Sequence, residues 1–258
     1  MNPRFRVTVA GSSSSIPRPA RACSSYLVDD GASKIVLDLG SGAFANVRLH
    51  VDFASIGAVV ISHMHADHFI DLIPLRYALR YGLEAPKKIP LYLPPGGEAI
   101  LRRLTDAFVN EGGDFLSDVF DVANYDPTRE LRLRESVLRF APTRHYIPAF
   151  AIRAESEGRA VTYSADTAPT PAVVELAAGS DVFICESTLA DGAHENGSLR
   201  GHSSAREAGT MAHDAGVGRL YLTHYTGEVA AGDLMNEAAE TFGAAVNVVD
   251  DNTAIDIH

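Results

Sequence analysis

The stretch Val59–Phe69 places four metal-binding side chains within six positions. Its sequence is VVISHMHADHF, so a short apolar run leads directly into His63, His65, Asp67 and His68. Side chains two positions apart on an extended or loop segment point to the same side, so His63 and His65 can bind one metal ion. Asp67 and His68 turn away from that side and can serve a second ion. The pattern predicts a two-metal loop at the end of a strand.

Three more residues of metal-binding type follow apolar runs elsewhere in the chain. His145 comes after the run Val137–Ala141, Asp166 ends the run AVTYSAD, and His224 ends the run RLYLTH. One loop cannot complete a dinuclear site, because each ion takes three or more protein groups together with a shared water. A single histidine in such a place is more often an ordinary core or loop residue. Three such residues together with the loop favour a shared metal centre.

Strands in the first third of the chain, and alternating strands and helices toward its end, must position these residues. Apolar runs and alternation predict strands at Phe5–Val9, Cys23–Val28, Lys34–Leu37, Ala58–Ile61, Ile89–Leu93, Leu131–Leu133, Val137–Ala141, Phe150–Ala154, Ala160–Ser164, Val182–Cys185, Arg219–Thr223 and Asn247–Val249. Helical spacing predicts helices at Ile70–Tyr81, Glu98–Val109, Pro171–Ala178, Ser203–Ala215 and Asp233–Phe242. We therefore expect an α/β protein in which helices cover the outer faces of two sheets, a four-layer αβ/βα sandwich.

Length and composition predict one compact domain over residues 1–258. The chain is 46% hydrophobic, which is enough for a full core, and its net charge is −11. That charge works against sequence-independent nucleic-acid binding, which depends on counterion release. Arginines gather in the segment 129–144, at Arg129, Arg132, Arg134, Arg139 and Arg144. Alternating arginines on strands are more typical of a solvated face than of a binding site.

The cysteines and the N-terminal sequence indicate a reducing compartment. Cys23 and Cys185 lie in predicted strands, so we expect buried free thiols and no disulfide. The first residues contain neither a long apolar segment nor a small-residue cleavage site. No later run approaches the ~18 apolar residues of a membrane span. We expect a soluble, cytoplasmic protein with no membrane partner.

The motif SHMHADH resembles the signature of the metallo-β-lactamase superfamily, and YSADT, CEST, GHSSAREAGTMAHDAGV and YLTHY are similar to its ribonuclease Z-like branch. The resemblance covers nearly the whole chain and implies an αβ/βα sandwich with metals at one edge between the sheets. It implies one zinc ion on His63, His65 and His145, a second on Asp67, His68 and His224, and Asp166 as the bridge. Manganese and iron also suit such ligands. A hydroxide that bridges the two ions is the implied nucleophile, and Asp67 accepts the proton of the water that forms it.

Glu186 and His202 are chosen by position and by the same resemblance. Glu186 ends the apolar run DVFICE, and His202 lies just before a predicted helix. From the residues alone, GHSSARE is more simply a helix start, in which a serine caps the helix and Glu207 completes a capping box. Ribonuclease Z-like enzymes, however, pair the Glu of a His-Glu-Ala-Thr segment with the His of a Gly-His-Ser-Thr segment. Here Cys185 replaces the first histidine. The resemblance implies that His202 contacts the phosphate or protonates the leaving oxygen while Glu186 orients it.

The spacing between two predicted ligands bears on the substrate. Branch members that process transfer RNA carry a basic, Gly-rich arm, which many bacterial members insert between the third metal histidine and the bridging aspartate. In this chain only residues 146–165 separate His145 from Asp166, enough for one hairpin through the acidic turn Glu155–Gly158. We therefore expect a phosphodiesterase acting on a small phosphodiester, such as a 2′,3′- or 3′,5′-cyclic nucleotide. Extended nucleic acid is not an expected partner.

Three alternatives remain open from the sequence. The first is an endonuclease that matures transfer-RNA 3′ ends, aided by the arginines of segment 129–144. The second is a lactonase or another ester hydrolase, which uses much the same ligands without the Glu186/His202 pair. The third is a metal-binding regulatory or scaffold protein without turnover, although such proteins usually lose ligands. Relatives are often homodimers, and the apolar helix Ile70–Leu79 suits either an interface or the core.

Overall fold

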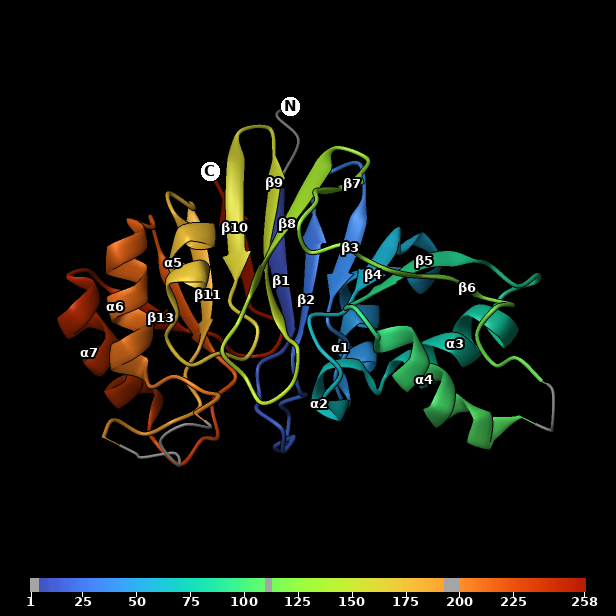
Figure 1. Cartoon of the computed structure of the whole chain (residues 1–258), viewed down its shortest axis with the longest axis horizontal. Helices are drawn as coiled ribbons and strands as arrows, with labels where there is room; N and C mark the ends of the chain where they lie inside the picture. The colour runs from blue at the N-terminus through green and yellow to red at the C-terminus, as the bar shows by residue number, and fades with distance from the viewer. Residues whose placement is uncertain (1–4, 110–112, 193–199) are drawn as a thin grey trace.

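Two seven-stranded sheets lie face to face in the computed structural model, which describes residues 5–109, 113–192 and 200–258 (Figure 1). The first sheet has the order β14-β1-β2-β3-β4-β5-β6, with β14 Ala254–Ile257, β1 Phe5–Gly11, β2 Ser25–Asp29, β3 Lys34–Leu37, β4 Ala58–Val60, β5 Ile89–Leu93 and β6 Phe120–Asn124. The second has the order β13-β12-β11-β10-β9-β8-β7, with β13 Val246–Val248, β12 Leu220–Thr223, β11 Val182–Glu186, β10 Arg159–Tyr163, β9 Phe150–Ser156, β8 Ser136–Pro142 and β7 Leu131–Leu133.

Strand direction in both sheets follows from the connections. Strands joined by short turns pair antiparallel, as β2 does with β3 and β9 with β10. Strands separated by a helix pair parallel, as β3 does with β4 and β10 with β11. A parallel pair needs a long crossover, and a helix provides it. Each sheet therefore contains parallel strands whose carboxyl ends lie along one edge.

Helices cover the outer face of each sheet and leave the two inner faces in contact. The helices of the first half are α1 Ala43–His50, α2 Ala66–Phe69, α3 Leu72–Tyr81 and α4 Gly97–Thr105, with 3-10 turns η1 Phe53–Ser55 and η2 Asp106–Phe108. Those of the second half are α5 Pro171–Ala177, α6 Ala205–Ala215 and α7 Ala231–Phe242. Figure 1 shows these two groups of helices on opposite sides of the paired sheets.

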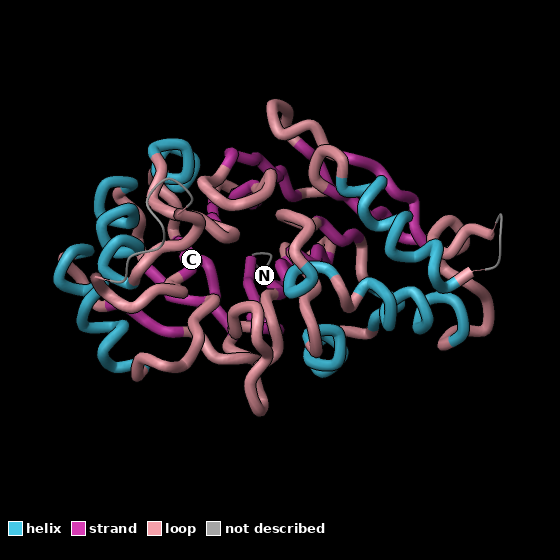
Figure 2. Tube along the Cα trace, turned by 60° about the horizontal axis from the view of Figure 1, so that its bottom comes forward, coloured by secondary structure: helices cyan, strands magenta, loops and turns pink. Residues whose placement is uncertain are grey.

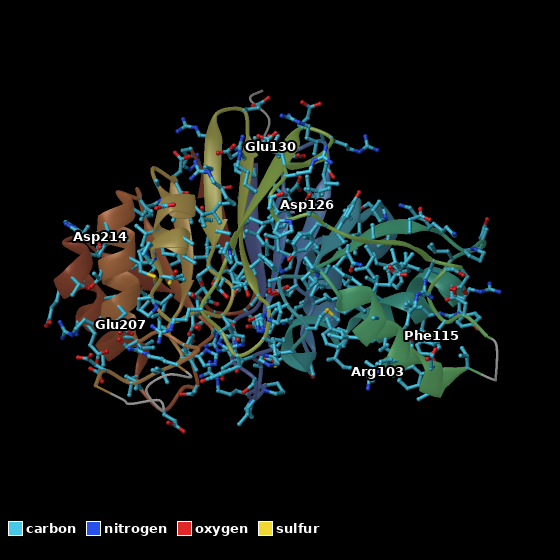
Figure 3. All side chains as sticks on the ribbon, in the orientation of Figure 1. Arg103, Phe115, Asp126, Glu130, Glu207 and Asp214 are labelled. Atoms are coloured by element: carbon cyan, nitrogen blue, oxygen red, sulfur yellow. The ribbon has the colours of Figure 1, made fainter. Side chains whose placement is uncertain are left out.

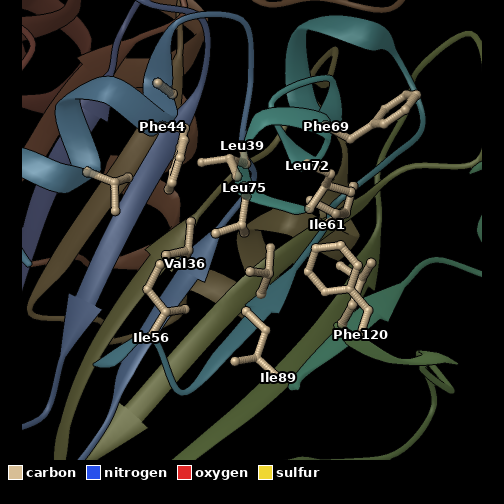
Figure 4. Packing of buried hydrophobic residues seen from close by; sticks show 14 of the residues in the cluster. Val36, Leu39, Phe44, Ile56, Ile61, Phe69, Leu72, Leu75, Ile89 and Phe120 are labelled. Atoms are coloured by element: carbon tan, nitrogen blue, oxygen red, sulfur yellow. The ribbon is translucent and has the colours of Figure 1, made fainter. Parts of the chain in front are cut away.

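Strands with two buried faces hold the layers together. In β3, Val36 packs in the outer cluster with Leu72 and Leu75 of α3 (Figure 4). Its neighbours Ile35 and Leu37 belong instead to a central cluster that also contains residues of β8 to β11 in the second sheet. Successive side chains of a strand point to opposite faces, so an unbroken apolar run fits a strand covered on both sides. A third cluster lies between the second sheet and α5 to α7.

The observed fold confirms the predicted αβ/βα sandwich. A hairpin with Asp30 and Gly31 in its turn joins β2 to β3, and Gly31 has a left-handed φ of 83°. Cys23 and Cys185 are buried free thiols, as predicted. Burial is the main cause that raises the pKa of Cys23 to about 12. Among the described residues, no helix has the length and apolar character to cross a membrane.

Five short elements, α1, α2, η1, β6 and β14, were not predicted from the sequence. Helix α1 has only eight residues, begins after the left-handed Gly42 and has no side-chain cap at its start. Strands β6 and β14 have five and four residues and alternate polar with apolar side chains over too short a span for a clear pattern. The helix predicted at Ile70–Tyr81 begins instead at Leu72, after the separate short helix α2. Strand β14 forms because Ile255 and Ile257 pair with β1, a contact between residues far apart in the sequence.

Candidate metal centre

The loop after β4 carries the first four candidate ligands. His63 and His65 precede α2, and Asp67 and His68 lie within it. Short backbone hydrogen bonds fix the loop, from His68 N to His65 O (3.0 Å) and from Leu39 N to His68 O (2.7 Å). Helix α2 lies at the lower edge of the molecule in Figure 1, and Figure 2 shows loops gathered along that edge between the helices. The loop therefore faces the edge where the parallel strands end.

The three distant candidates come to the same edge. Each follows a strand of the second sheet: His145 follows β8, Asp166 follows β10 and His224 follows β12. The structure brings all seven predicted side chains together in two groups, in each of which the ligand atoms lie within 4.8 Å of one another. The first group is His63, His65, His145 and Asp166, and the second is Asp67, His68, Asp166 and His224. The grouping matches the division inferred from the motif.

Asp166 belongs to both groups through different oxygens. Its Oδ2 lies 3.7 Å from His63 Nε2 and 3.8 Å from His145 Nε2. Its Oδ1 lies 3.3 Å from His68 Nε2 and 3.4 Å from His224 Nε2. One carboxylate thus presents an oxygen to each group, which is the arrangement a bridging ligand requires.

Several of the candidate donor atoms lack hydrogen-bond partners among the described residues, and bound cations would replace those partners. Within the described part of the chain, His63 Nε2, His68 Nε2 and Asp166 Oδ1 are buried and have no hydrogen-bond partner. Buried polar atoms in native proteins are nearly always satisfied, so three orphaned atoms converging on one place need an explanation. Imidazole nitrogens and carboxylate oxygens are ligands of divalent transition metals. A pair of such ions would satisfy all three atoms.

Hydrogen bonds behind the histidines select which nitrogen each one presents. His145 Nδ1 donates to the carbonyl of Gly201 (2.9 Å), so its Nε2 faces the first group. His224 Nδ1 lies 2.8 Å from Thr188 Oγ1, so its Nε2 faces the second group. His65 differs, because its Nδ1 lies 2.9 Å from His145 Nε2. Partners of this kind fix the tautomer and ring orientation of metal-binding histidines.

Asp38, which was not predicted from the sequence, is a buried hydrogen-bond acceptor beneath the centre. Its Oδ2 accepts from His68 Nδ1 (2.8 Å), Tyr163 Oη (3.0 Å) and Ser62 Oγ (2.7 Å). Because the Ser62 hydroxyl donates to Asp38, it accepts from His63 Nδ1 at 3.0 Å. Asp38 thus orients one histidine of each group. It directly follows the apolar run of β3, so the rule that identified Asp166 applies to it as well.

Three residues with strained backbone conformations lie at the same edge. Asp38, Ala165 and His224 have φ values of 55°, 49° and 52°, in the left-handed region that non-glycine residues seldom adopt. Each lies within three residues after the end of a strand that leads to the centre. Such conformations persist where the surrounding contacts enforce them, and they are frequent at functional sites.

Burial and charge set the protonation of the ligands. Burial is the largest effect that lowers the pKa of His63, His65 and His145, so these imidazoles favour the neutral form that binds metal. For His68 burial also acts downward, but nearby carboxylates, Asp166 first, outweigh it and raise the pKa well above its usual value. The pKa of Asp166 lies well below the usual range, because the surrounding histidines outweigh its burial. The carboxylates of the second group therefore favour a positive charge close to them.

Glu186 and His202 form a pair beside both groups, as the resemblance implied. Glu186 is fully buried, and its Oε1 accepts from His202 Nδ1 at 3.0 Å and from the backbone N of Thr167 at 2.7 Å. The His202 ring stacks on His224 with centroids 5.8 Å apart. The predicted capping box is also present, with Ser204 and Glu207 at the start of α6. His202 thus precedes a helix start and also lies at the metal centre.

Thr188 links the pair to a metal ligand and was not predicted. Its Oγ1 lies 2.7 Å from Glu186 Oε2 and 2.8 Å from His224 Nδ1. One hydroxyl therefore joins the carboxylate that holds His202 to the imidazole that faces the second group. Thr188 ends the CEST motif, at the position of the threonine in the His-Glu-Ala-Thr segment, so this motif was the sequence signal that could have identified it.

The chain belongs to the metallo-β-lactamase superfamily: the family model described as Beta-lactamase superfamily domain matches residues 26–225. Uncharacterized protein Rv1339 of Mycobacterium tuberculosis is 33% identical over 247 residues, which cover 95% of this chain and 89% of that protein. Ribonuclease Z of Mycobacterium bovis is 29% identical over 277 residues, covering 98% and 99%.

A solved structure gives the same assignment. The crystal structure of the metallo-beta-lactamase fold protein YhfI from Bacillus subtilis superposes with a TM-score of 0.87 and 26% identity, and covers 98% of this chain and 99% of that one. These similarities confirm the resemblance to the ribonuclease Z-like branch. Family, fold and the paired His/Asp groups together define a metal-dependent hydrolase with a dinuclear type of site.

Proposed function

We propose that the protein is a dinuclear zinc phosphodiesterase that hydrolyses a small phosphodiester, such as a 2′,3′- or 3′,5′-cyclic nucleotide. The observation that carries the proposal is the Glu186–His202 pair, with 3.0 Å between Oε1 and Nδ1, stacked beside His224. Cleavage of a phosphodiester releases an alkoxide oxygen that needs a proton, and a positioned imidazole supplies one. A lactonase on the same fold does not require this pair.

Zinc suits the donor set of the two groups. Mixed nitrogen and oxygen ligands are ordinary for zinc, and a catalytic site keeps a position open for water or substrate. Two divalent ions held by these groups would supply positive charge for the phosphoryl group and would lower the pKa of water. They would also make this edge attractive to an anion in a chain whose net charge is −11.

The chain's own residues then have separate roles. Glu186 accepts from Nδ1 of His202 and so orients that ring, which would give a proton to the leaving oxygen of the substrate. Asp67 accepts a proton from the attacking water. Burial raises the pKa of Asp67, but the nearby imidazoles of His224 and His68 outweigh that effect and lower it, so the carboxylate is ionised at neutral pH.

Charge around the arginine segment supports a small substrate. Arg132 pairs with Glu130, and Arg139 pairs with both Glu130 and Glu155. These acidic partners offset the charge of two of the five arginines in segment 129–144, and an RNA backbone would require that positive charge. In Figure 3, Glu130 lies at the upper end of the molecule, opposite the edge that carries α2 in Figure 1. The turn from Ser156 to Arg159 between β9 and β10 is a tight hairpin.

Maturation of transfer-RNA 3′ ends is the second candidate. The similarity to Ribonuclease Z of Mycobacterium bovis, which extends over 98% of this chain, favours it. That reaction uses the same phosphodiester chemistry, so the metal centre alone does not separate the two functions. The size and charge of the preferred substrate separate the two functions.

A substrate panel tests the proposal. The protein supplied with Zn²⁺ is assayed on bis-p-nitrophenyl phosphate, 2′,3′- and 3′,5′-cyclic nucleotides, a lactone and a precursor transfer RNA. We expect hydrolysis of the small diesters with release of a terminal phosphate. A preference for the precursor transfer RNA would establish the second candidate. Hydrolysis of the lactone alone, or of no ester despite bound zinc, would refute both.

Two substitutions test the assigned roles within the same assay. His63→Ala removes a ligand and should abolish diester hydrolysis together with zinc at the first group. Glu186→Gln should retain zinc, because Glu186 belongs to neither of the two groups that Asp166 joins. It should lower kcat by up to about 10²- to 10⁴-fold, the contribution of a general acid, because glutamine no longer holds His202 as the proton donor. Full activity in His63→Ala, or unchanged kcat in Glu186→Gln, would contradict the assignment.

A further inference from the structure

Tyr146 lies beside the metal centre and has no role in the mechanism above. It directly follows His145, and 48% of its surface is exposed. Its ring centroid lies 4.9 Å from that of His145 and 5.7 Å from that of His202. The rings of His145 and His202 lie 5.0 Å apart. Tyr146 therefore contacts both a ligand of the first group and the proposed proton donor.

The absence of a side chain at Gly201 leaves room for the Tyr146 ring. A Cβ atom added at Gly201 would come within 2.7 Å of two atoms of that ring. The φ angle of Gly201 is not in the left-handed region, so the close ring, and not backbone conformation, requires glycine here. The carbonyl of the same residue accepts the hydrogen bond from His145 Nδ1. Gly201 thus accepts a hydrogen bond from one candidate metal ligand and leaves room for the tyrosine beside that ligand.

The core does not account for this aromatic side chain. Tyr146 belongs to none of the three hydrophobic clusters found among the described residues. The next residue, Ile147, does pack against one of them. A large ring kept half-exposed next to a reaction centre suits recognition of a planar group, because aromatic rings bind nucleobases and aryl groups by stacking.

We infer that Tyr146 stacks on a planar ring of the substrate, so that the preferred substrates are phosphodiesters bearing a nucleobase or an aryl group. The inference rests on the proposed phosphodiesterase function and adds the chemical class of the ester arm. Such a ring contributes to ground-state binding as well as to the transition state, so its loss raises KM more than it lowers kcat.

Matched substrates isolate the contribution of the ring. Adenosine 2′,3′-cyclic phosphate is compared with methyl riboside 2′,3′-cyclic phosphate, which has the same reacting group and no base. Bis-p-nitrophenyl phosphate is compared with methyl p-nitrophenyl phosphate, which has the same leaving group and no second ring. The first pair reports on nucleobases and the second on aryl groups, so the two sources of a planar ring are distinguished.

In Tyr146→Ala, we expect the preference for the ring-bearing member of at least one pair, expressed as a ratio of kcat/KM values, to fall about tenfold. The loss should lie mainly in KM, and the dissociation constant for AMP or p-nitrophenyl phosphate, measured by calorimetry, should rise by a similar factor. Tyr146→Phe keeps the ring and should keep the preference. Gly201→Ala pushes the ring away and should reduce the preference in the same direction.

Tyr77→Ala is the matched control. Tyr77 is 46% exposed, lies on α3 and contacts Phe115 and Tyr81 instead of the metal centre. Its removal should leave both preferences unchanged. Zinc content and the unfolding temperature of each variant show whether the centre has formed.

Two kinds of result would overturn the inference. If the wild-type protein hydrolyses no phosphodiester, the proposed function and this inference fail together. If it hydrolyses the diesters but Tyr146→Ala lowers both members of each pair equally, or Tyr146→Phe loses as much preference as Tyr146→Ala, only the stacking role fails.

Discussion

A single buried carboxylate, Asp38, supports one histidine in each ligand group. It holds His68 directly and His63 through Ser62, and it also accepts from Tyr163 in the second sheet. A carboxylate behind an imidazole fixes its tautomer and raises its basicity toward the metal. We therefore expect the affinity of the centre for metal to depend on Asp38, although Asp38 belongs to neither ligand group.

Substitution of Asp38 tests that dependence. Asp38→Asn keeps the size of the side chain but removes the charge and one acceptor oxygen, so zinc affinity should fall about 10- to 100-fold in a chelator competition assay. Asp30→Asn is the control. Asp30 is also buried, and accepts from Ser33 N and Ser136 Oγ away from the centre. The Asp30→Asn substitution should lower stability and leave zinc affinity unchanged. Unchanged zinc affinity in Asp38→Asn would refute the supporting role of Asp38.

Residue chemistry explains which parts of the centre could be predicted from the sequence. The seven candidate ligands have metal-binding side chains at the ends of apolar runs, and both properties are visible in one sequence. Thr188 and Tyr163 act through a hydroxyl that points across the fold, and only the three-dimensional structure places them. Asp38 lies between these cases, because its position after β3 was visible but its partners were not.

At the scale of elements, the ends of strands and the close packing of their loops position the ligands. The loop after β3 passes directly beneath α2, where a Cβ atom on Gly40 would lie 1.9 Å from the carbonyl oxygen of Asp67. No side-chain rotation relieves an overlap with backbone. The loop after β3 and the ligand-bearing helix can approach this closely only because residue 40 is glycine.

Gly40→Ala should therefore disturb the metal loop. We expect destabilisation of at least ~1–3 kcal/mol, the range for overpacking, with weakened zinc binding, measured by denaturant unfolding and metal titration. Gly232→Ala in α7 is the control, because its Cβ atom would meet nothing within 4 Å and alanine favours a helix. Equal stability of Gly40→Ala and the wild-type protein would show that the loop tolerates displacement.

Periodicity predicted most of the elements but not their ends or the shortest ones. Helices such as α6 and α7 were identified because a one-sided apolar pattern persists over three turns. The missed elements, α1, α2, η1, β6 and β14, are too short for a period to emerge. Pairing of β14 with β1 joins residues about 250 positions apart, and no local pattern encodes such a contact.

At the scale of the whole molecule, the centre joins the two sheets. His63, His65, Asp67 and His68 follow β4 of the first sheet, whereas His145, Asp166 and His224 follow strands of the second. Each ligand group contains residues from both. Bound metal would therefore hold the halves of the sandwich together and would compensate the buried atoms that lack partners.

Removal of metal should lower the thermal stability of the whole chain. Free zinc at a hundredfold excess over its dissociation constant stabilises a folded protein by about 2.7 kcal/mol. In a protein of this size, that corresponds to roughly 5–10 °C in Tm. We expect a loss of this order after chelation and its recovery on adding Zn²⁺, measured by calorimetry. The His63→Ala variant should recover less.

The most direct test of the account is the location of metal in crystals of the zinc-loaded protein, from anomalous scattering at the zinc edge. The account predicts two peaks, one among His63, His65 and His145 and one among Asp67, His68 and His224, with Asp166 next to both. No peak at this edge of the molecule, or zinc bound only elsewhere, would contradict it.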